Sequence, residues 1–300
     1  MQLLPQSIPA GLEVTVPVPV PAGDTVSVWV VRLNCAVTLA AAARLDSTQV
    51  LVPEQPPPDQ PANVEPTAGA AVSVTTVLKA KLALQVEPRF DKYIFIERSP
   101  ERCQQLEGLK TEFPALKDDI DVRQGEANEV IQKLCADPSK WKSRRAVLFL
   151  DPYGMQVEWK TIEAVAATKA IDLWLLVPLG MGMNRLAPKS GKLPESWRQR
   201  MNAFLGTADW YDEFYKVETK PTLFGDHQVQ VKASMDVMAR YFNNRLKQVF
   251  AGVAEEPGVL WNSSKNPLYL FCFAVGNERG KDIALRIANH LLKTNIKEVR

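Results

Sequence analysis

Polar side chains that could bind a small polar ligand follow three successive apolar runs of the sequence. Glu97 comes after the run 93–96, Gly125, Glu126 and Asn128 come after 120–123, and Asp151, Pro152 and Tyr153 come after 146–150. In open α/β sheets, ligands bind beyond the carboxyl ends of the strands. We therefore expect these residues to line one edge of one sheet.

Each group suits a different part of a nucleoside cofactor or of an amine substrate. Glu97 could accept hydrogen bonds from both ribose hydroxyls. Glu126 or Asn128 could bind the adenine edge, because its exocyclic amine needs an acceptor. Asp151 and the carbonyl that follows it could accept hydrogen bonds from a substrate amine, and Tyr153 offers a face on which a planar group can stack.

Each of these features also has an ordinary structural interpretation. An acid after a strand is more often a helix cap or a solvated residue. Asp, Pro and Gly in the turn 151–154 are common turn formers. What favours a binding site is that three such groups follow successive strands in order.

The elements that would position these residues are predicted from residue 79 onward, where strand-length apolar runs alternate with helix-period segments. We expect strands at 93–96, 120–123, 146–150, 173–177 and 268–274, and helices near 99–109, 127–134, 158–169, 234–250 and 279–293. The helix after residue 98 has Ser99 as a candidate N-cap and Pro100 in its first turn. The last helix is predicted to turn Ala284, Ile287, Ala288 and Leu291 inward.

Three regions of different composition divide the chain. Residues 1–78 are rich in Pro, Ala and Val, and we expect a disordered or aberrant segment there. Residues 79–183 form the predicted α/β core. Residues 184–300 are predicted to hold a helical insertion, with Trp197, Phe204, Trp210 and Phe214 as packing anchors, followed by a strand and a helix that complete the fold.

Charge, cysteine and hydropathy patterns exclude several functional classes. A net charge of +2 gives no global signature of a nucleic-acid or membrane binder. The four cysteines form no Cys-x-x-Cys pair and the two histidines lie far apart, so we expect neither a metal site nor a His-based hydrolase. No membrane span or export signal is visible, and we expect a cytoplasmic protein.

Several blocks of the sequence together resemble one known family. They are 90–97 (FDKYIFIE), 124–128 (QGEAN), 149–154 (FLDPYG), 184–186 (NRL), 204–210 (FLGTADW) and the segment 262–277. Their order and spacing over residues 80 to 300 resemble the three-Cys-motif partner (TcmP) proteins, which are similar to class I methyltransferases that use S-adenosylmethionine.

The resemblance implies a fold, a cofactor and a partner. The fold would be a Rossmann-like methyltransferase sheet with a mainly helical C-terminal extension, and the partner would be a three-Cys-motif protein. By analogy with amino-group methyltransferases that act on nucleic-acid bases, Asp151, Pro152 and Tyr153 would form the catalytic block. Glu97, Arg98, Gly125, Glu126 and Asn128 would bind S-adenosylmethionine, with Glu97 on the ribose, and nucleic acid becomes a candidate substrate.

One part of the family pattern is missing. Such proteins open with a strand that ends in a glycine-rich loop, whose glycines let the backbone approach the cofactor. No such loop precedes Tyr93. Either this chain lost the first strand and loop, or residues 1–78 come from a displaced reading frame or an unrelated fusion. We favour the displaced frame, because the composition changes where the resemblance begins.

Three functions remain open from the sequence. The first is methyl transfer to an amine, with a nucleobase as a candidate acceptor. The second is a catalytically inactive accessory protein that works with a three-Cys-motif partner, which the missing loop favours. The third is a DNA-binding module between residues 184 and 259, which salt-dependent DNA affinity would reveal.

Overall fold

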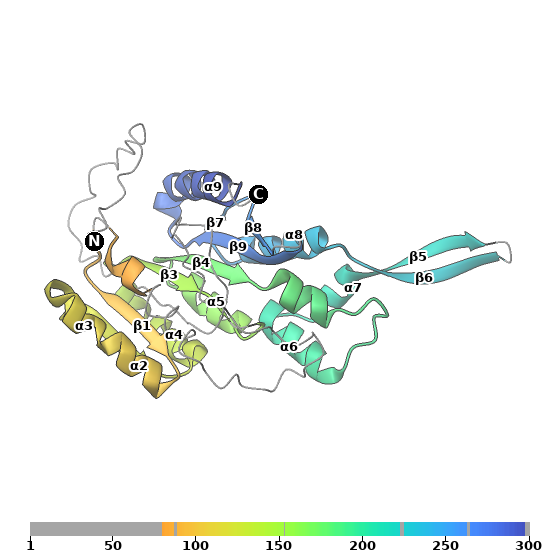
Figure 1. Cartoon of the computed structure of the whole chain (residues 1–300). Coiled ribbons are helices and arrows are strands. Elements are labelled where there is room, and N and C mark those ends of the chain that lie inside the picture. The colour runs from red at the N-terminus through yellow and green to blue at the C-terminus, as the bar shows by residue number, and fades with distance from the viewer. Residues whose placement is uncertain (1–79, 87–88, 153, 223–224, 263–264, 298–300) are drawn as a thin grey trace.

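The computed structural model describes residues 80–86, 89–152, 154–222, 225–262 and 265–297 as a mixed α/β protein (Figure 1). The predictions for residues 1–78 and for Tyr153 therefore lie outside the described residues. Residues 80–84 are helical and lead toward the first labelled strand.

Two groups of strands make up the body of the protein. β1 (Tyr93–Glu97) pairs in parallel with β2 (Ile120–Gln124), and β3 (Ala146–Leu150) pairs in parallel with β4 (Ile171–Val177). The other edge of β4 carries the antiparallel strand β9 (Pro267–Val275), and β7 (Gly252–Val253) and β8 (Gly258–Trp261) both pair with β9. No ladder joins β1 to β3 within the described ranges. The four strands expected up to residue 177 and the strand near 268–274 are confirmed.

The helices between these strands also follow the predicted pattern. α2 (Pro100–Glu107) begins after Ser99, whose hydroxyl accepts a hydrogen bond from the Arg102 amide, and α3 (Leu109–Glu112) follows directly. The short 3-10 helix Pro114–Leu116 leads to β2. α4 (Ala127–Cys135) and the 3-10 helix Pro138–Trp141 connect β2 to β3, and α5 (Trp159–Ala167) connects β3 to β4.

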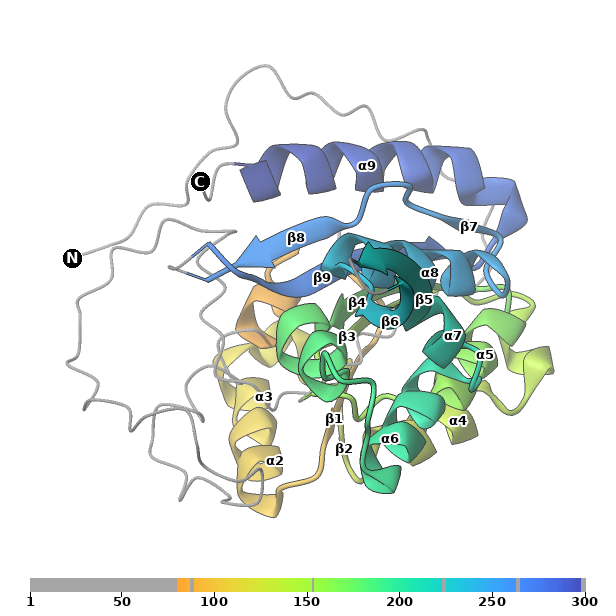
Figure 2. The same ribbon diagram turned by 90° about the vertical axis from the view of Figure 1, so that its right-hand side faces the viewer.

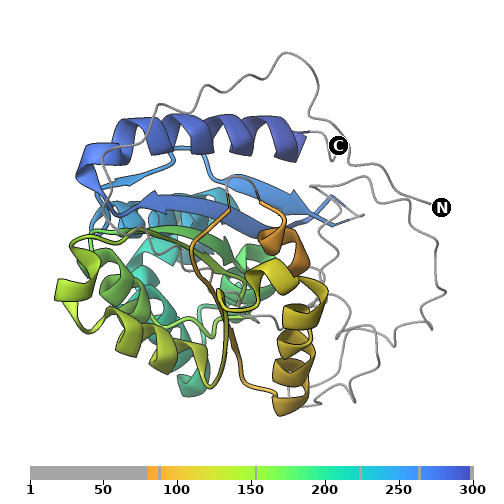
Figure 3. The same ribbon diagram turned by 90° about the vertical axis from the view of Figure 1, so that its left-hand side faces the viewer.

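Side chains from the two faces of the strands enter different apolar clusters. Ile94 and Ile96 of β1 join Leu148 and Leu150 of β3 in the largest cluster, together with residues of α4 and α5. The alternate residues Tyr93 and Phe95 of β1 pack with Leu106 and Leu109 of α2 and α3 in a second cluster. This alternation is the period of two expected of a strand covered on both faces. Figure 3 shows α2 and α3 on one side of β1 and β2, with α4 on the other side.

The chain after β4 builds a second set of helices. A π-helix spans Leu179–Asn184, and α6 (Glu195–Leu205), α7 (Trp210–Phe214) and α8 (Met235–Lys247) follow. Phe204, Trp210 and Phe214 are fully buried in the main cluster, which confirms them as packing anchors. Trp197 is only half-buried. This region therefore packs onto the α/β body through its aromatic side chains.

The prediction of a mainly helical C-terminal extension missed a long β-hairpin. β5 (Tyr215–Thr222) and β6 (Gly225–Lys232) pair in antiparallel fashion over their full length. Figure 1 shows that this hairpin projects away from the body. Apolar and polar residues alternate there only in short stretches, YKVE at 215–218 and QVQVK at 228–232, and Val217 and Val229 are exposed because a projecting ribbon has no face to bury. The strand signal in the sequence is therefore weak.

The last helix is present, but its predicted inward face is partly wrong. A 3-10 helix, Glu278–Gly280, leads into α9 (Lys281–Lys297), which covers β7, β8 and β9 on the side away from α4 and α5 (Figures 2 and 3). Ala288 and Leu292 are buried there, whereas Ile287 and Leu291 are exposed. Apolar residues surround more than half of this helix, so its periodicity allowed two stripes, and packing against β9 selects one of them.

Candidate functional site at the strand ends

The segments that follow β1, β2 and β3 contact one another at one edge of the protein. The Gly125 amide, just after β2, donates a hydrogen bond of 3.0 Å to the carbonyl oxygen of Glu97 at the end of β1. Asn128, at the start of α4, bonds to the backbone of Gln156 and Glu158, which follow β3. The structure thus brings together the three segments that hold the residues singled out in the sequence.

Glu97 is a buried carboxylate with one oxygen bonded and one without a hydrogen bond. Its side chain is 3% exposed. Oε1 accepts hydrogen bonds from the Ser99 amide at 2.8 Å and from the Arg102 guanidinium at 2.9 Å. Oε2 is buried and accepts no hydrogen bond. The Arg102 Nε–H is also buried and has no acceptor.

An unbonded carboxylate oxygen in a buried place is costly. A buried acceptor that loses its partner costs about 1–3 kcal/mol, and more when it carries charge. The ion pair with Arg102 offsets part of the cost of burying the Glu97 charge, but it leaves Oε2 unsatisfied. A ligand hydroxyl that donates to Oε2 would remove this penalty. Glu97 is therefore the side chain of the site best prepared to accept a hydrogen bond.

The next residue, Arg98, differs from its neighbour. Its side chain is exposed, and no hydrogen bond or ion pair joins it to another described residue. The structure places it next to the site in sequence but in solvent.

Gly125 and Glu126 form the turn between β2 and α4. A Cβ at Gly125 would approach the Val130 side chain to 2.9 Å, so this close turn favours glycine. Glu126 is the N-cap of α4, and its Oε2 accepts a 2.7 Å hydrogen bond from the Asn128 amide. The carboxylate thereby lies at the positive end of the helix dipole, where negative charge is stabilised.

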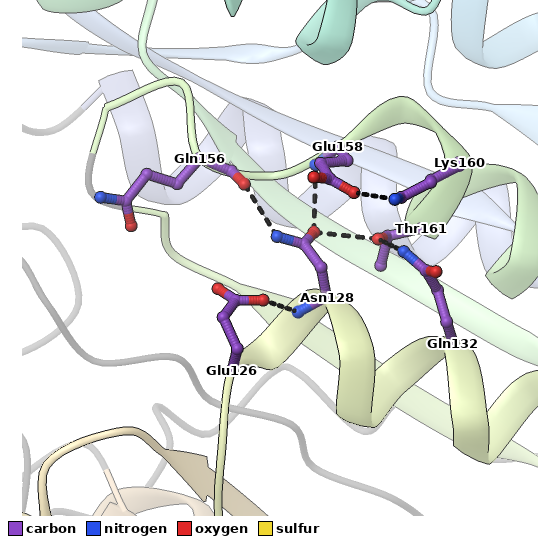
Figure 4. Close-up of polar contacts among 7 residues, drawn as sticks. All are labelled: Glu126, Asn128, Gln132, Gln156, Glu158, Lys160 and Thr161. Atoms are coloured by element: carbon purple, nitrogen blue, oxygen red, sulfur yellow. Dashed lines mark hydrogen bonds and ion pairs between the residues drawn. The ribbon is translucent and has the colours of Figure 1, made fainter.

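Asn128 is the centre of a buried hydrogen-bond network (Figure 4). Its Nδ2 donates to the Gln156 carbonyl at 2.9 Å. Its Oδ1 accepts from the Glu158 amide at 3.0 Å and from the Thr161 hydroxyl at 2.9 Å. The Thr161 oxygen in turn accepts a 2.7 Å hydrogen bond from the Gln132 side chain.

This network fixes the loop after β3 against the start of α4. Both lone pairs of the Asn128 amide oxygen are occupied, so the side chain works as a clamp between two chain segments. Of the two residues considered for the adenine edge, Glu126 is the one nearer to solvent, because it is half-buried while Asn128 is buried. The same clamp holds the far end of the 151–158 loop, and so helps to position its beginning.

That beginning is the buried pair Asp151 and Pro152. Asp151 is 2% exposed at the end of β3, and Pro152 is buried beside it. Gly154 has φ of +57°, a left-handed conformation that favours glycine and turns the chain. Further along, the Met155 and Val157 side chains are buried in the main cluster, which ties the loop to the core.

Sequence reasoning missed the partners of the singled-out residues. Arg102 pairs with Glu97 from the first turn of α2, five residues along the chain, and its position opposite a strand-end acid was an available signal. Thr161 bonds to Asn128, which lies 33 residues earlier in the chain. Gln132 bonds to Thr161, which lies 29 residues later. Such long-range contacts leave no local pattern in the sequence.

Comparison with protein-family models and with curated proteins found no match to this chain. Among the residues that the structure describes, no group of three or more His, Cys, Asp or Glu side chains is arranged to hold a metal ion. Within the same ranges, no helix has both the length and the apolar character needed to cross a membrane.

Proposed function

We propose that this protein is an S-adenosylmethionine-dependent methyltransferase of the three-Cys-motif partner type that methylates an amino group, with a nucleobase as the favoured acceptor. The observation that carries the proposal is the buried Oε2 of Glu97, which has no hydrogen-bond donor at the end of β1. A ribose hydroxyl is a donor of the required kind.

The proposed cofactor contacts follow from the order of the strand ends. Glu97 accepts hydrogen bonds from the ribose, and Glu126 lies near the adenine. Asn128 supports these contacts by holding the loop after β3 in place. Arg98 is the remaining cofactor-binding candidate, next to Glu97 in the sequence. Gly125 brings the backbone of the second turn close to Glu97, through the 3.0 Å hydrogen bond between them.

The acceptor amine is held by the block after β3. Asp151 and the Pro152 carbonyl accept hydrogen bonds from the amine, which orients its lone pair, and Tyr153 stacks on the ring that carries it. S-adenosylmethionine, when bound, supplies an electrophilic methyl group. In the transfer, the amine nitrogen would gain the methyl carbon as the carbon–sulfur bond breaks, S-adenosylhomocysteine would leave, and the methylated amine would lose one proton to solvent. The carbon moves in line between two atoms, so positioning by these residues supplies most of the catalysis.

The proposed fold is a Rossmann-like methyltransferase sheet in which the described residues place no strand between β1 and β3. The supporting observation is that β1 and β3 both contribute to the main apolar cluster, although no ladder joins them among the described residues. That position is where the strand with the glycine-rich loop would belong in a doubly wound sheet.

A second candidate function is that of an accessory protein that binds a three-Cys-motif partner without cofactor. Two observations favour it. The sequence holds no glycine-rich loop before Tyr93. In addition, Arg102 already neutralises Glu97, so the carboxylate has a structural role even without ligand.

Calorimetric titration with S-adenosylmethionine separates the two functions. The methyltransferase predicts micromolar binding by the full chain, weakened at least about tenfold in Glu97→Gln and retained in Asp151→Asn. Glu101→Gln is the matched control, because Glu101 is exposed in the first turn of α2 and the charge change is the same. No binding by the full chain would exclude the methyltransferase and leave the accessory protein.

A further inference from the structure

An open hollow lies at the end of β4, between the π-helix 179–184, the start of α8 and the start of β9. Its volume is about 450 Å³, which lies within the range of small-molecule sites. Met181 and Met235 provide apolar walls, and Asn184, Arg185 and Asn266 provide polar ones. None of these residues belongs to the cofactor contacts proposed above.

The base of the hollow depends on a close approach of two backbone segments. A Cβ at Gly180 would lie 2.2 Å from the carbonyl oxygen of Pro267, so only glycine fits there. Two of the sequence blocks named earlier, 184–186 and 262–277, thus meet at this place. A contact from β9 also holds Met181, because the Tyr269 hydroxyl donates a hydrogen bond to its sulfur at 3.7 Å.

The π-helix beside the hollow contacts the loop that begins at Asp151 and Pro152. A Cβ at Gly182, within the π-helix, would lie 2.8 Å from the sulfur of Met155, which follows Asp151 by four residues. The loop after β3 and the π-helix after β4 are therefore in direct contact. A substrate that fills the hollow would extend along the same edge of the protein.

Three cations lie beside the hollow, and the exposed carboxylate of Asp236 follows the lining residue Met235. Arg185 and Lys189 are exposed, and Lys232, the last residue of β6, donates a 2.8 Å hydrogen bond to the carbonyl of Asn184. Burial, and then the positive charge of Lys189, lower the pKa of Lys232. No carboxylate of the described chain forms a salt bridge with any of the three.

The methionine walls suit a planar base. Thioether sulfur makes favourable contacts with aromatic rings, and flexible methionines adapt to different ring shapes. The Asn184 and Asn266 amides can each donate and accept hydrogen bonds at the edge of such a ring. Uncompensated cations beside an apolar hollow are the combination that binds a nucleotide with its phosphate.

We propose that this hollow binds one nucleotide of a single-stranded nucleic acid, with the base against Met181 and Met235 and the neighbouring phosphates on Arg185, Lys189 and Lys232. The inference names the substrate class of the methyltransferase proposed above and in that respect rests on it. A single strand is favoured over a duplex because an open hollow of this volume accepts one unstacked base.

The test is fluorescence anisotropy of a labelled 12-nucleotide single strand with the full chain, without S-adenosylmethionine, from 50 to 200 mM salt. We expect Arg185→Gln/Lys189→Gln to weaken binding about tenfold or more at low salt. The dependence of log K on log salt should become shallower by roughly 1.4, because two phosphate contacts at about 0.7 each are lost.

Lys247→Gln is the matched control for these substitutions. Lys247 is exposed at the end of α8 opposite to Met235, about 18 Å along the helix, and its replacement should leave affinity and salt slope unchanged. A strand with abasic sites should bind several-fold more weakly than the intact strand, since the hollow then receives no base.

Three results would overturn the assignment. They are equal binding by the double variant and the parent chain, equal binding of the abasic strand, and displacement of the oligonucleotide by poly-glutamate at the same charge concentration. Because no S-adenosylmethionine is present, oligonucleotide binding by a chain that fails to bind cofactor would retain this site while excluding the methyltransferase. Cofactor binding without oligonucleotide binding would exclude this nucleotide site and retain the methyltransferase.

Discussion

Glu97, the last residue of β1, and Asn128, at the start of α4 after β2, are two buried polar side chains whose surroundings differ. The side-chain oxygen of Asn128 accepts two hydrogen bonds, and its nitrogen donates one to a backbone carbonyl, all within the protein. Glu97 has one oxygen bonded twice and the other without a donor. The difference separates a side chain that holds the site together from one that is prepared to accept a ligand.

Burial alone would not have separated these two roles. Both residues are almost fully removed from solvent, Glu97 at the end of β1 and Asn128 at the start of α4 after β2. What separates them is whether each polar atom has a partner, because a buried unsatisfied atom costs free energy that a ligand can recover. The predictions below test that distinction.

The largest loss of stability is expected for Asn128→Ala. The substitution removes the acceptor for the Glu158 amide and the Thr161 hydroxyl and the donor for the Gln156 carbonyl, so the free energy of unfolding should fall by about 3 kcal/mol. Urea denaturation measures it. Asn244→Ala, at an exposed position of α8, should change stability by less than about 0.5 kcal/mol. A similar small change at Asn128 would show that the network is not a clamp.

A smaller loss is expected for Glu97→Gln. The amide can still accept from the Ser99 amide, but the charge that balances Arg102 is gone, so we expect a loss of about 2 kcal/mol. The same denaturation experiment with Glu101→Gln, an exposed acid of α2, should show almost no change. If Glu97→Gln instead raised stability, the buried carboxylate would be strained overall, and its pairing with Arg102 would be too weak to offset its burial.

Cysteine reactivity compares the two regions directly, because one cysteine lies beside Glu97 and another lies in α4, the helix of Asn128. Cys103 lies in α2 beside Glu97, and its pKa is raised by burial and then by the Glu97 charge, whereas Arg102 lowers it. Burial alone raises the pKa of Cys135, in α4, to about 12. Because the thiolate is the reactive form, Glu97→Gln should lower the pKa of Cys103 and speed its alkylation at pH 8 several-fold, with Cys135 unchanged.

Peptide mapping by mass spectrometry after iodoacetamide treatment reads each cysteine separately. In the parent chain, labelling of Cys103 should precede that of Cys135 and of the buried Cys272, whose pKa burial raises to about 12. All rates should rise with pH as thiolate forms. An equal acceleration of Cys135 in Glu97→Gln would indicate general loosening of the fold rather than a local change of charge.

The smallest effect is expected for Lys160→Ala. Lys160 forms a 2.8 Å ion pair with Glu158 at the exposed end of the Asn128 network (Figure 4), and its side chain is 65% exposed. Exposed pairs of this kind contribute little, so the free energy of unfolding should change by less than about 0.5 kcal/mol. A loss as large as that of Asn128→Ala would mean that the ion pair, and not the buried amide, holds the loop.

Local patterns in the sequence predicted most of the fold's elements but not all of their faces. The strand 146–150 and the helix capped by Ser99 appear as expected, because apolar periodicity and capping depend on residues close together in the chain. The hairpin 215–232 was missed because it lacks a buried face. The inward face of α9 was partly wrong because its apolar residues allow two stripes.

The sequence by itself determined which residues follow each strand, and therefore which polar groups gather at one edge. Only the tertiary structure decided which of them are satisfied. The bonds of Asn128 to Gln156, Glu158 and Thr161 span 28 to 33 residues, and the hollow beside Met181 forms where residues 180 and 267 touch. Contacts over such separations depend on how whole elements pack, because hydrogen-bond geometry is met or missed within tenths of an ångström, which no local pattern specifies.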